Sequence, residues 1–218
     1  GYRMNYYAVT AMLARVYCWA GEYGNAYKEA KEVVDATYST GSTSTASCFN
    51  FSNSLTTNRK DYNSIIMTFF KSTCYEDYLP YMTKGNDVVL VVNTTNLFGD
   101  EAGADDRNLD LFGDWDGGDI KYSFKYDIKE GTSGTDMIPA IRLSEMYYIM
   151  GEYFAYKDEF SKAGEMLDKV RYARGISTTN LASSIGSLEV FHTHLIKEMR
   201  REFVGEGQMF FQYKRLDQ

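Results

Sequence analysis

The sequence is poor in the residues that build several common kinds of site. Its 218 residues include 2 Pro, 3 Cys and 2 His. Three scattered cysteines are too few for a disulfide framework or a zinc site. No apolar run approaches the roughly 18 residues that span a bilayer. With 23 basic against 30 acidic residues, the net charge of −7 argues against a nucleic-acid binder held by phosphate contacts.

Apolar and aromatic residues are abundant instead. Hydrophobic residues make up 44% of the chain and aromatic residues 16%, with 19 Tyr. A chain of this length can bury a sizeable core, which excludes a disordered protein. Tyr offers apolar area and a polar tip, so it suits wet cores as well as carbohydrate or protein contacts.

An α-helical hairpin occurs twice. Residues 5–36 have helical spacing, with Gly21 at the turn, and the spacing predicts one apolar face on the first helix. The residues of that face are Tyr6, Val9, Leu13, Val16, Tyr17 and Ala20. The pattern returns with an offset of 137 residues. Leu13, Ala14, Tyr17, Tyr23, Ala26, Ala30 and Val33 correspond to Met150, Gly151, Phe154, Phe160, Ala163, Leu167 and Val170. This large–small–aromatic spacing is typical of tetratricopeptide repeats.

The remaining segments complete a mainly α fold, with tetratricopeptide-like hairpins and an irregular loop and short-strand insert. We expect one domain: hairpins at 2–38 and 138–175, an insert at 39–137, and C-terminal helices at 187–216 that bend at Gly205–Gly207. Within the insert, 65–70, 88–92 and 120–128 favour strands, whereas 37–57 and 99–119 favour loops.

Charged and titratable residues are interpreted first as structural. Arg142 and Glu145 are predicted to pair with each other on one helix, partly buried. The row Glu198, Arg200, Arg201, Glu202 and Glu206 is interpreted as a solvated face with capping bonds. His192 and His194 are two apart on a predicted helix and cannot easily chelate one metal. No nucleophile elbow or phosphate loop supports a hydrolase or a kinase.

The candidate ligand-binding residues lie in the insert. Trp115, between Asp114 and Asp116, could stack on a sugar ring while the carboxylates accept hydrogen bonds from hydroxyls. Tyr78 and Tyr81, near Pro80 in a predicted loop, could do the same or could anchor that loop on the helices. Trp19 is expected in the core or in the packing between repeats.

Calcium is a further candidate ligand for the acidic loops. Asp105, Asp106 and the run 114–119 supply carboxylates, but the ligand order of an EF-hand is absent. We therefore interpret them as solvated loops, and no cofactor is expected.

Three blocks resemble the SusD/RagB family of outer-membrane nutrient-binding lipoproteins. They are the early hairpin from Tyr6, the run Ile138–Tyr147 with its R-x-x-E step, and the segment Glu198–Arg215, which is similar to the family's E-x-R-R-E-x-x-x-E-G signature. The signature residues here are Arg142, Glu145, Glu198, Arg201, Glu202, Glu206 and Gly207. Asp106-Arg107 and Phe124-Lys125-Tyr126 also match family tendencies, whereas Met209 and Gln212 depart from an expected Arg and Asp.

The resemblance implies a non-enzymatic glycan-binding protein on the outer membrane that passes its ligand to a TonB-dependent transporter. Family members are about twice this long, so we expect a trimmed C-terminal portion without the lipidated cysteine. The alternative is a tetratricopeptide-like scaffold that binds protein or peptide without a carbohydrate ligand. An enzyme on this scaffold would need convergent carboxylates near Trp115.

Overall fold

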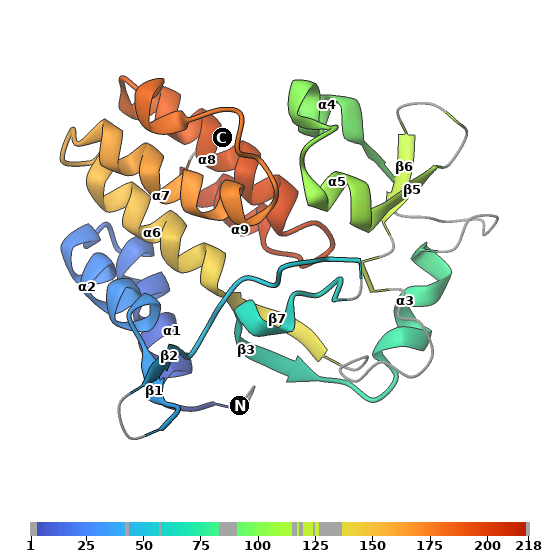
Figure 1. Cartoon of the computed structure of the whole chain (residues 1–218), viewed down its shortest axis with the longest axis horizontal. Helices are drawn as coiled ribbons and strands as arrows, with labels where there is room; N and C mark the ends of the chain where they lie inside the picture. The colour runs from blue at the N-terminus through green and yellow to red at the C-terminus, as the bar shows by residue number, and fades with distance from the viewer. Residues whose placement is uncertain are drawn as a thin grey trace.

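The structure is a computed structural model and describes residues 4–41, 44–56, 58–82, 91–114, 117, 120–123, 125–126 and 137–216. The helical hairpins form one side of the molecule and most of the insert lies on the other (Figure 1). The helical side consists of α1 (Tyr6–Trp19), α2 (Tyr23–Val34), α6 (Leu143–Ala155), α7 (Phe160–Ala173), α8 (Leu188–Glu202) and α9 (Met209–Leu216). No helix in the described ranges is both long and apolar enough to cross a membrane.

The repeated hairpin is confirmed. The first helices begin at Tyr6 and Leu143 and the second helices at Tyr23 and Phe160, so both pairs keep the offset of 137 residues. The two hairpins pack together through α2 and α6. At this contact the ring of Tyr23 stacks on Tyr156, with centroids 3.9 Å apart. Fully buried alanines, such as Ala26 and Ala30 on α2, let the helices approach closely.

The apolar stripe predicted for α1 is exposed rather than buried. Tyr6, Val9, Leu13 and Val16 are 65%, 46%, 41% and 55% exposed. The buried side of α1 carries small residues instead: Ala8, Ala11, Ala14 and Cys18. Small side chains permit the closest helix contacts, so the alanine side faces the other helices although it is less hydrophobic. Trp19 does not lie in the core either, because it is 42% exposed and lies beside Phe211 of α9.

The helical spacing of apolar residues over 188–203 predicts one buried stripe on α8, and the structure confirms it. Phe191, Leu195, Met199 and Phe203 are at most 1% exposed. The chain then bends, as expected, through two glycines with positive φ, Gly205 and Gly207, before α9 begins. This bend places α9 beside the end of α8.

The insert contains more regular structure than its sequence suggested. Its strands are β1 (Thr37–Ser39), β2 (Thr45–Ser47), β3 (Ile65–Phe70), β4 (Val91–Asn93), β5 (Phe112–Asp114) and β6 (Ile120–Ser123), and β7 (Met137–Arg142) follows it. Its helices are α3 (Cys74–Met82), α4 (Thr94–Phe98) and α5 (Asp106–Leu111), and short 3-10 turns lie at η1 (Tyr62–Ser64), η2 (Gly99–Glu101) and, outside the insert, η3 (Leu181–Ser183).

The strands form three small antiparallel sheets, β1–β2, β3–β7 and β4–β6–β5. The predicted loop at 37–57 thus contains a hairpin. The predicted strand at 120–128 ends at Ser123, and the described Lys125 and Tyr126 form a turn. Residues 138–142, predicted as helix, form β7, because Pro139 and its β-branched neighbours favour extended backbone.

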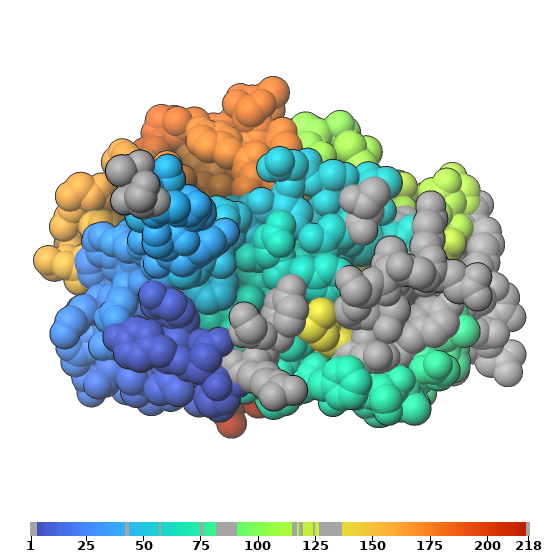
Figure 2. All heavy atoms as spheres, turned by 60° about the horizontal axis from the view of Figure 1, so that its bottom comes forward, coloured from blue at the N-terminus to red at the C-terminus, as the bar shows by residue number. Residues whose placement is uncertain are grey.

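Helix α3 corrects the predicted loop around Pro80. Glu76 and Asp77 in its first turn complement the positive end of the helix dipole. In the view of Figure 2, the N-terminal segment and α3 lie towards opposite ends of one face, and a small yellow patch of β7 is visible between them.

Candidate functional site

A network of buried charges joins the insert to the C-terminal helices. Arg107 of α5 is 1% exposed. Its guanidinium donates hydrogen bonds to Asp105 at 2.7 Å and, across the interface, to Glu198 of α8 at 2.9 Å. Asp105 is fully buried and also caps α5, since it accepts a hydrogen bond from the backbone N–H of Arg107. The interpretation of Asp105 as part of a solvated loop is therefore wrong.

Arg201 of α8 also joins the helix to the insert, through hydrogen bonds to α4. Its guanidinium donates to the carbonyl oxygens of Leu97 and Phe98, at 3.0 and 2.9 Å. It also donates to Glu101 at 2.6 Å. Burial alone would raise the pKa of Glu101, but hydrogen bonds from Arg201 and Thr179 and the nearby guanidinium charges lower it to about 2.

Glu206 holds two buried cations at the bend before α9. Lys125 donates to its carboxylate at 2.5 Å, and the Nε of Arg142 donates at 2.8 Å. Burial lowers the pKa of Lys125, because the attraction of Glu206 offsets only part of the desolvation. For Arg142, burial acts the same way, but the carboxylate of Glu206 outweighs it and raises the pKa. One carboxylate thus ties the insert and β7 to the bend.

The predicted pairing of Arg142 with Glu145 is wrong. Arg142 ends β7 and precedes α6, so the two residues do not share a helix face. Glu145 instead accepts a hydrogen bond at 2.6 Å from Arg15 of α1. The R-x-x-E step therefore contributes two separate long-range ion pairs.

The solvated face predicted for the α8 signature is wrong as well. Glu198, Arg201 and Glu202 are 2%, 1% and 4% exposed, and the side chain of Glu206 is fully buried. Burial alone would raise the pKa of Glu202, but the surrounding guanidinium groups, Arg174 foremost, lower it well below its ordinary value. Arg200 is the exposed member of the row.

A groove lies between the two parts that this network joins, and α4 packs directly against α8 beside it. Its volume is about 540 Å³, within the usual range for small-molecule sites. We call it the α4–α9 groove. Its lining residues are Val91, Val92, Asn93, Asn96, Leu97, Arg200, Phe203, Val204, Gly205, Gly207, Met209, Phe210 and Tyr213. Because buried ion pairs hold both walls, the groove is preformed.

The groove combines aromatic surface with neutral hydrogen-bonding groups. Phe210 is 71% exposed and Tyr213 is half-buried, so both present ring surface. On the opposite wall, Asn93 and Asn96 are exposed. The amide oxygen of Asn93 caps α4 by accepting from the backbone N–H of Asn96 at 2.9 Å, which orients the rest of that amide. Apolar ring faces opposite amides suit a ligand with one apolar and one hydroxylated side.

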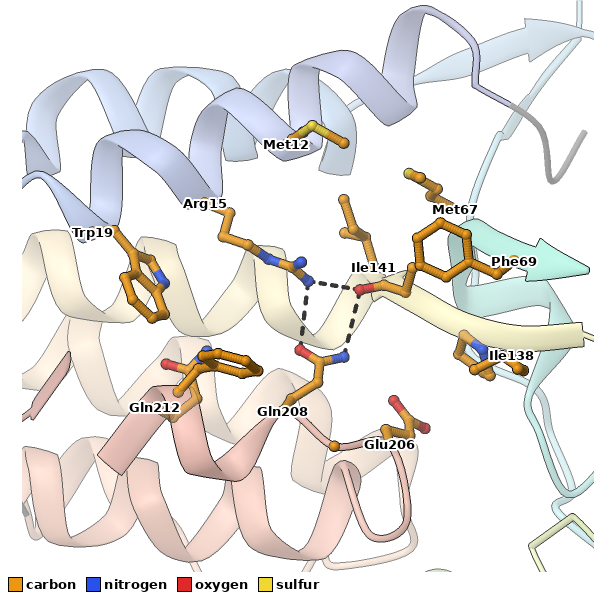
Figure 3. Close-up of a pocket in the computed structure, with 14 residues that line it drawn as sticks. Met12, Arg15, Trp19, Met67, Phe69, Ile138, Ile141, Glu206, Gln208 and Gln212 are labelled. Carbon is orange, nitrogen blue, oxygen red and sulfur yellow. Dashed lines mark hydrogen bonds between the residues drawn. The ribbon is translucent and has the colours of Figure 1, made fainter. Parts of the chain in front are cut away.

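A second hollow, of about 360 Å³, lies between α1, the β3–β7 sheet and α9. Figure 3 shows Arg15 reaching across it towards Gln208 and the backbone at residue 140, with Trp19 at one end and Phe69 at the other. Its walls are mainly apolar, and Arg15 is already paired with Glu145. This hollow therefore offers fewer available polar groups than the α4–α9 groove.

Of the ligand-binding residues predicted from sequence, the three that the structure describes, Tyr78, Tyr81 and Asp114, line neither hollow. Tyr78 stacks on the buried Tyr126, with ring centroids 4.6 Å apart, which is the packing role considered as its alternative. Tyr81 is 52% exposed on α3. Asp114 ends β5 and pairs with Lys121 at 3.4 Å. Trp115 and Asp116 lie outside the described residues, so their role stays a prediction.

Metal ligation finds no geometric basis in the described ranges, where no group of three or more His, Cys, Asp or Glu side chains could hold an ion. Most of the acidic run 114–119 lies outside those ranges, so calcium there stays untested. His192 and His194 are half-buried on α8, and burial lowers the pKa of both. Their ordinary state at neutral pH is therefore uncharged.

Sequence reasoning missed the groove itself. The one usable signal was Phe210 beside Phe211 on a short helix, where both rings cannot face the same core. Asn93 and Asn96 carry no recognisable motif, and their position depends on how α4 is held by Arg201.

Comparison with known proteins identifies the family. The model of the SusD family matches residues 14–218. A SusD superfamily protein from Bacteroides thetaiotaomicron VPI-5482 is 25% identical, with a TM-score of 0.70 over 98% of this chain and 50% of its own. A SusD-like carbohydrate binding protein from Bacteroides vulgatus ATCC 8482 is 19% identical, with a TM-score of 0.65 over 100% of this chain and 47% of its own.

Surface glycan-binding protein A from Bacteroides uniformis shares the fold too, at 16% identity and a TM-score of 0.66 over 96% of this chain and 49% of its own. No curated protein matches the chain. The chain spans about half the length of these solved relatives. Its charged signature residues have buried side chains that form ion pairs, and its helical hairpins repeat as the fold requires: the chain belongs to the SusD family.

Proposed function

We propose that this protein binds a glycan, without chemical conversion, in the α4–α9 groove. The observation that carries the proposal is a preformed groove with exposed aromatic rings on one wall and amides on the other. Pyranose rings have an apolar face that stacks on aromatic side chains and hydroxyls that bond to amides. Two solved proteins of the same fold are described as carbohydrate-binding and glycan-binding, which supports this ligand class.

The lining of the groove supports a binding role rather than a catalytic one. Glycoside hydrolysis ordinarily uses a pair of carboxyl groups on either side of the scissile bond. Among the residues that line the groove in the described part of the chain, none is Asp or Glu. The groove can therefore hold a sugar without attacking it.

Calorimetric titration against a panel of neutral and acidic oligosaccharides tests the proposal. We expect at least one glycan to bind, and Phe210→Ala to weaken that binding at least tenfold, about 1.4 kcal/mol. Phe70→Ala is the matched control, because Phe70 is 73% exposed and lines neither hollow. Absence of binding to every glycan, or equal effects of both variants, would refute glycan binding in the groove.

The same titration separates the groove from the site predicted in the insert. If Trp115→Ala and Tyr81→Ala abolish binding while Phe210→Ala does not, the ligand binds in the insert. The expected result is the reverse, because Tyr81 lies on α3 and does not line the groove.

We further propose, on the family resemblance, an outward-facing position at the outer membrane and transfer of the glycan to a TonB-dependent transporter. Co-purification of the native protein with such a transporter from cell envelopes, after mild detergent extraction, is the expected result. Recovery of the protein without any transporter, under conditions that keep glycan binding intact, would count against this partnership.

One feature favours the alternative of a peptide-binding scaffold. The exposed residues Val9 and Leu13 of α1 correspond in the repeat to Met146 and Met150 of α6, which are buried near α2. An amphipathic helix from a partner would fit this surface as α2 fits α6. Peptide binding that is lost in Leu13→Asp, together with the absence of binding to any glycan, would favour a peptide-binding scaffold.

A further inference from the structure

Arg200 differs from the other arginines that surround it in the fold. Seven described arginines pair with carboxylates: Arg15, Arg107, Arg142, Arg171, Arg174, Arg201 and Arg215. Arg200 follows Met199 and precedes Arg201, which are both buried, yet its own side chain is exposed. Among the described residues it has no carboxylate partner, and it lines the α4–α9 groove.

The position of Arg200 follows from the helix that carries it. Neighbouring residues on an α-helix point about 100° apart, so a buried Arg201 turns Arg200 towards the edge of the interface. Arg201 is held there by bonds to α4 carbonyl groups and to Glu101. The same bonds that close the network therefore place an available guanidinium group at the groove.

The charge of the groove is opposite to that of the chain. The chain carries 30 acidic residues and a net charge of −7. Nevertheless, Arg200 is the one charged side chain among the described groove-lining residues, and the remaining polar groups are amides, backbone and a phenol. With no acidic group in the lining to neutralise it, Arg200 gives the groove a local positive potential that favours an anion.

We propose that the ligand of the α4–α9 groove is an acidic glycan whose carboxylate or sulfate group is bound by Arg200. This inference rests on the proposed function and names the ligand class of the same groove. The planar guanidinium of Arg donates two parallel hydrogen bonds to a carboxylate or sulfate. The sugar ring then lies on the aromatic wall formed by Phe210 and Tyr213, while Asn93 and Asn96 bond to hydroxyls.

A matched set of oligosaccharides tests the inference. The probes are a tetramer of galacturonic acid, the same tetramer as its neutral methyl ester, and a sulfated galactan oligosaccharide. We expect the wild-type protein to bind at least one acidic probe tenfold more tightly than the methyl ester. Raising the salt concentration should weaken the acidic interaction more than the neutral one, since salt screens exposed charges. The acidic probe that binds distinguishes carboxylate from sulfate.

Variants of Arg200 assign the effect to this residue. Arg200→Gln should reduce the affinity for the acidic probe at least tenfold and leave the affinity for the methyl ester within twofold. Arg200→Lys should recover part of the affinity, because it restores the charge without the planar pair of donors. The control, Lys169→Gln, removes the same charge from an exposed position on α7 that does not line the groove, and should change neither affinity. Because both positions are exposed, thermal unfolding should show that all variants remain folded.

The outcomes separate this inference from the proposed function. Equal affinity for acidic and neutral probes, or an equal loss of both in Arg200→Gln, overturns the acidic ligand but leaves glycan binding intact. Absence of binding to all three probes, while a neutral glycan from the panel binds and is lost in Phe210→Ala, also overturns the acidic ligand alone. Absence of binding to every glycan overturns both the acidic ligand and the proposed glycan binding.

Discussion

The helical hairpins and the insert are held together by different chemistry. At the contact between α2 and α6, buried alanines and stacked tyrosines pack together, as in Tyr23 on Tyr156, and the described residues of the two helices form no ion pair with each other. At the contact between the insert and α8, the interior instead holds guanidinium and carboxylate groups, such as Arg107 with Glu198. A packed apolar contact tolerates small changes gradually, whereas a buried ion pair that loses one partner leaves an uncompensated charge. The insert should therefore respond more sharply to single substitutions and to pH.

The largest effect is expected at Glu206. Glu206→Gln leaves Lys125 and Arg142, which are 3% and 1% exposed, as neighbouring buried cations without their carboxylate. We expect a loss of about 3–5 kcal/mol in the free energy of unfolding, measured in urea. The exposed pair of Lys31 and Asp35 provides the control, and Asp35→Asn should change stability by less than about 1 kcal/mol. Equal effects of the two variants would show that the insert does not depend on buried charge.

The second prediction compares equivalent positions of the two hairpins. Met150 on α6 is 7% exposed, whereas its repeat equivalent on α1, Leu13, is 41% exposed. Met150→Ala should cost about 2–5 kcal/mol because it leaves a cavity, and Leu13→Ala about 0.5 kcal/mol or less. Chemical denaturation of both variants measures the difference. A large cost for Leu13→Ala would mean that α1 has a covering contact in solution.

As the pH falls, the insert should lose stability before the helical hairpins do. The pKa of Glu101 is lowered in the folded protein to about 2, from an ordinary value of 4.5. A lowered folded pKa contributes stability above the unfolded pKa, and that contribution is lost as the pH falls from about 4.5 towards 2. Hydrogen exchange at pH 3 should show earlier loss of protection in α4 and α5 than in α2. Glu101→Gln should flatten this pH dependence; an unchanged profile would contradict the assignment.

The smallest effect concerns the aromatic contact between the hairpins. The rings of Tyr27 and Tyr153 are stacked, with centroids 4.3 Å apart. A double-mutant cycle with Tyr27→Ala and Tyr153→Ala should give a coupling of about 0.5–1.5 kcal/mol. Val16 on α1 is the repeat equivalent of Tyr153 and is exposed. A double-mutant cycle with Tyr27→Ala and Val16→Ala should therefore give no coupling energy. Coupling at Val16 would show that the repeat equivalence is not reflected in the packing.

The helical hairpins could be predicted from the sequence, whereas the network of buried charges could not. Periodicity locates apolar seams, so the repeat offset of 137 residues and the α8 stripe from Phe191 to Phe203 agree with the structure. Periodicity cannot locate a buried charge, because it assigns Glu198 and Arg201 to the solvent side. The resemblance did mark these residues as a signature, but their partners, Arg107 and Leu97, lie about a hundred positions away. The α1 stripe failed for a related reason: hydrophobicity does not reveal whether a neighbouring element is present to cover it.

The α4–α9 groove could not be predicted from the sequence because its walls come from both the insert and the C-terminal helices. Asn93 and Arg200 line one cavity, although 107 positions separate them and no motif connects them. Only the folded position of α4 against α8, fixed by Arg201, brings the two walls together. The aromatic and acidic residues around Trp115 had a clearer sequence pattern, yet Asp114 is paired with Lys121 and does not line the groove.

A crystal structure of the protein with the tightest-binding glycan tests the central claim most directly. We expect a sugar ring stacked on Phe210 or Tyr213, hydroxyls bonded to Asn93 or Asn96, and an acidic substituent on Arg200. A glycan bound against Tyr81 and Asp114, with the α4–α9 groove empty, would contradict the account.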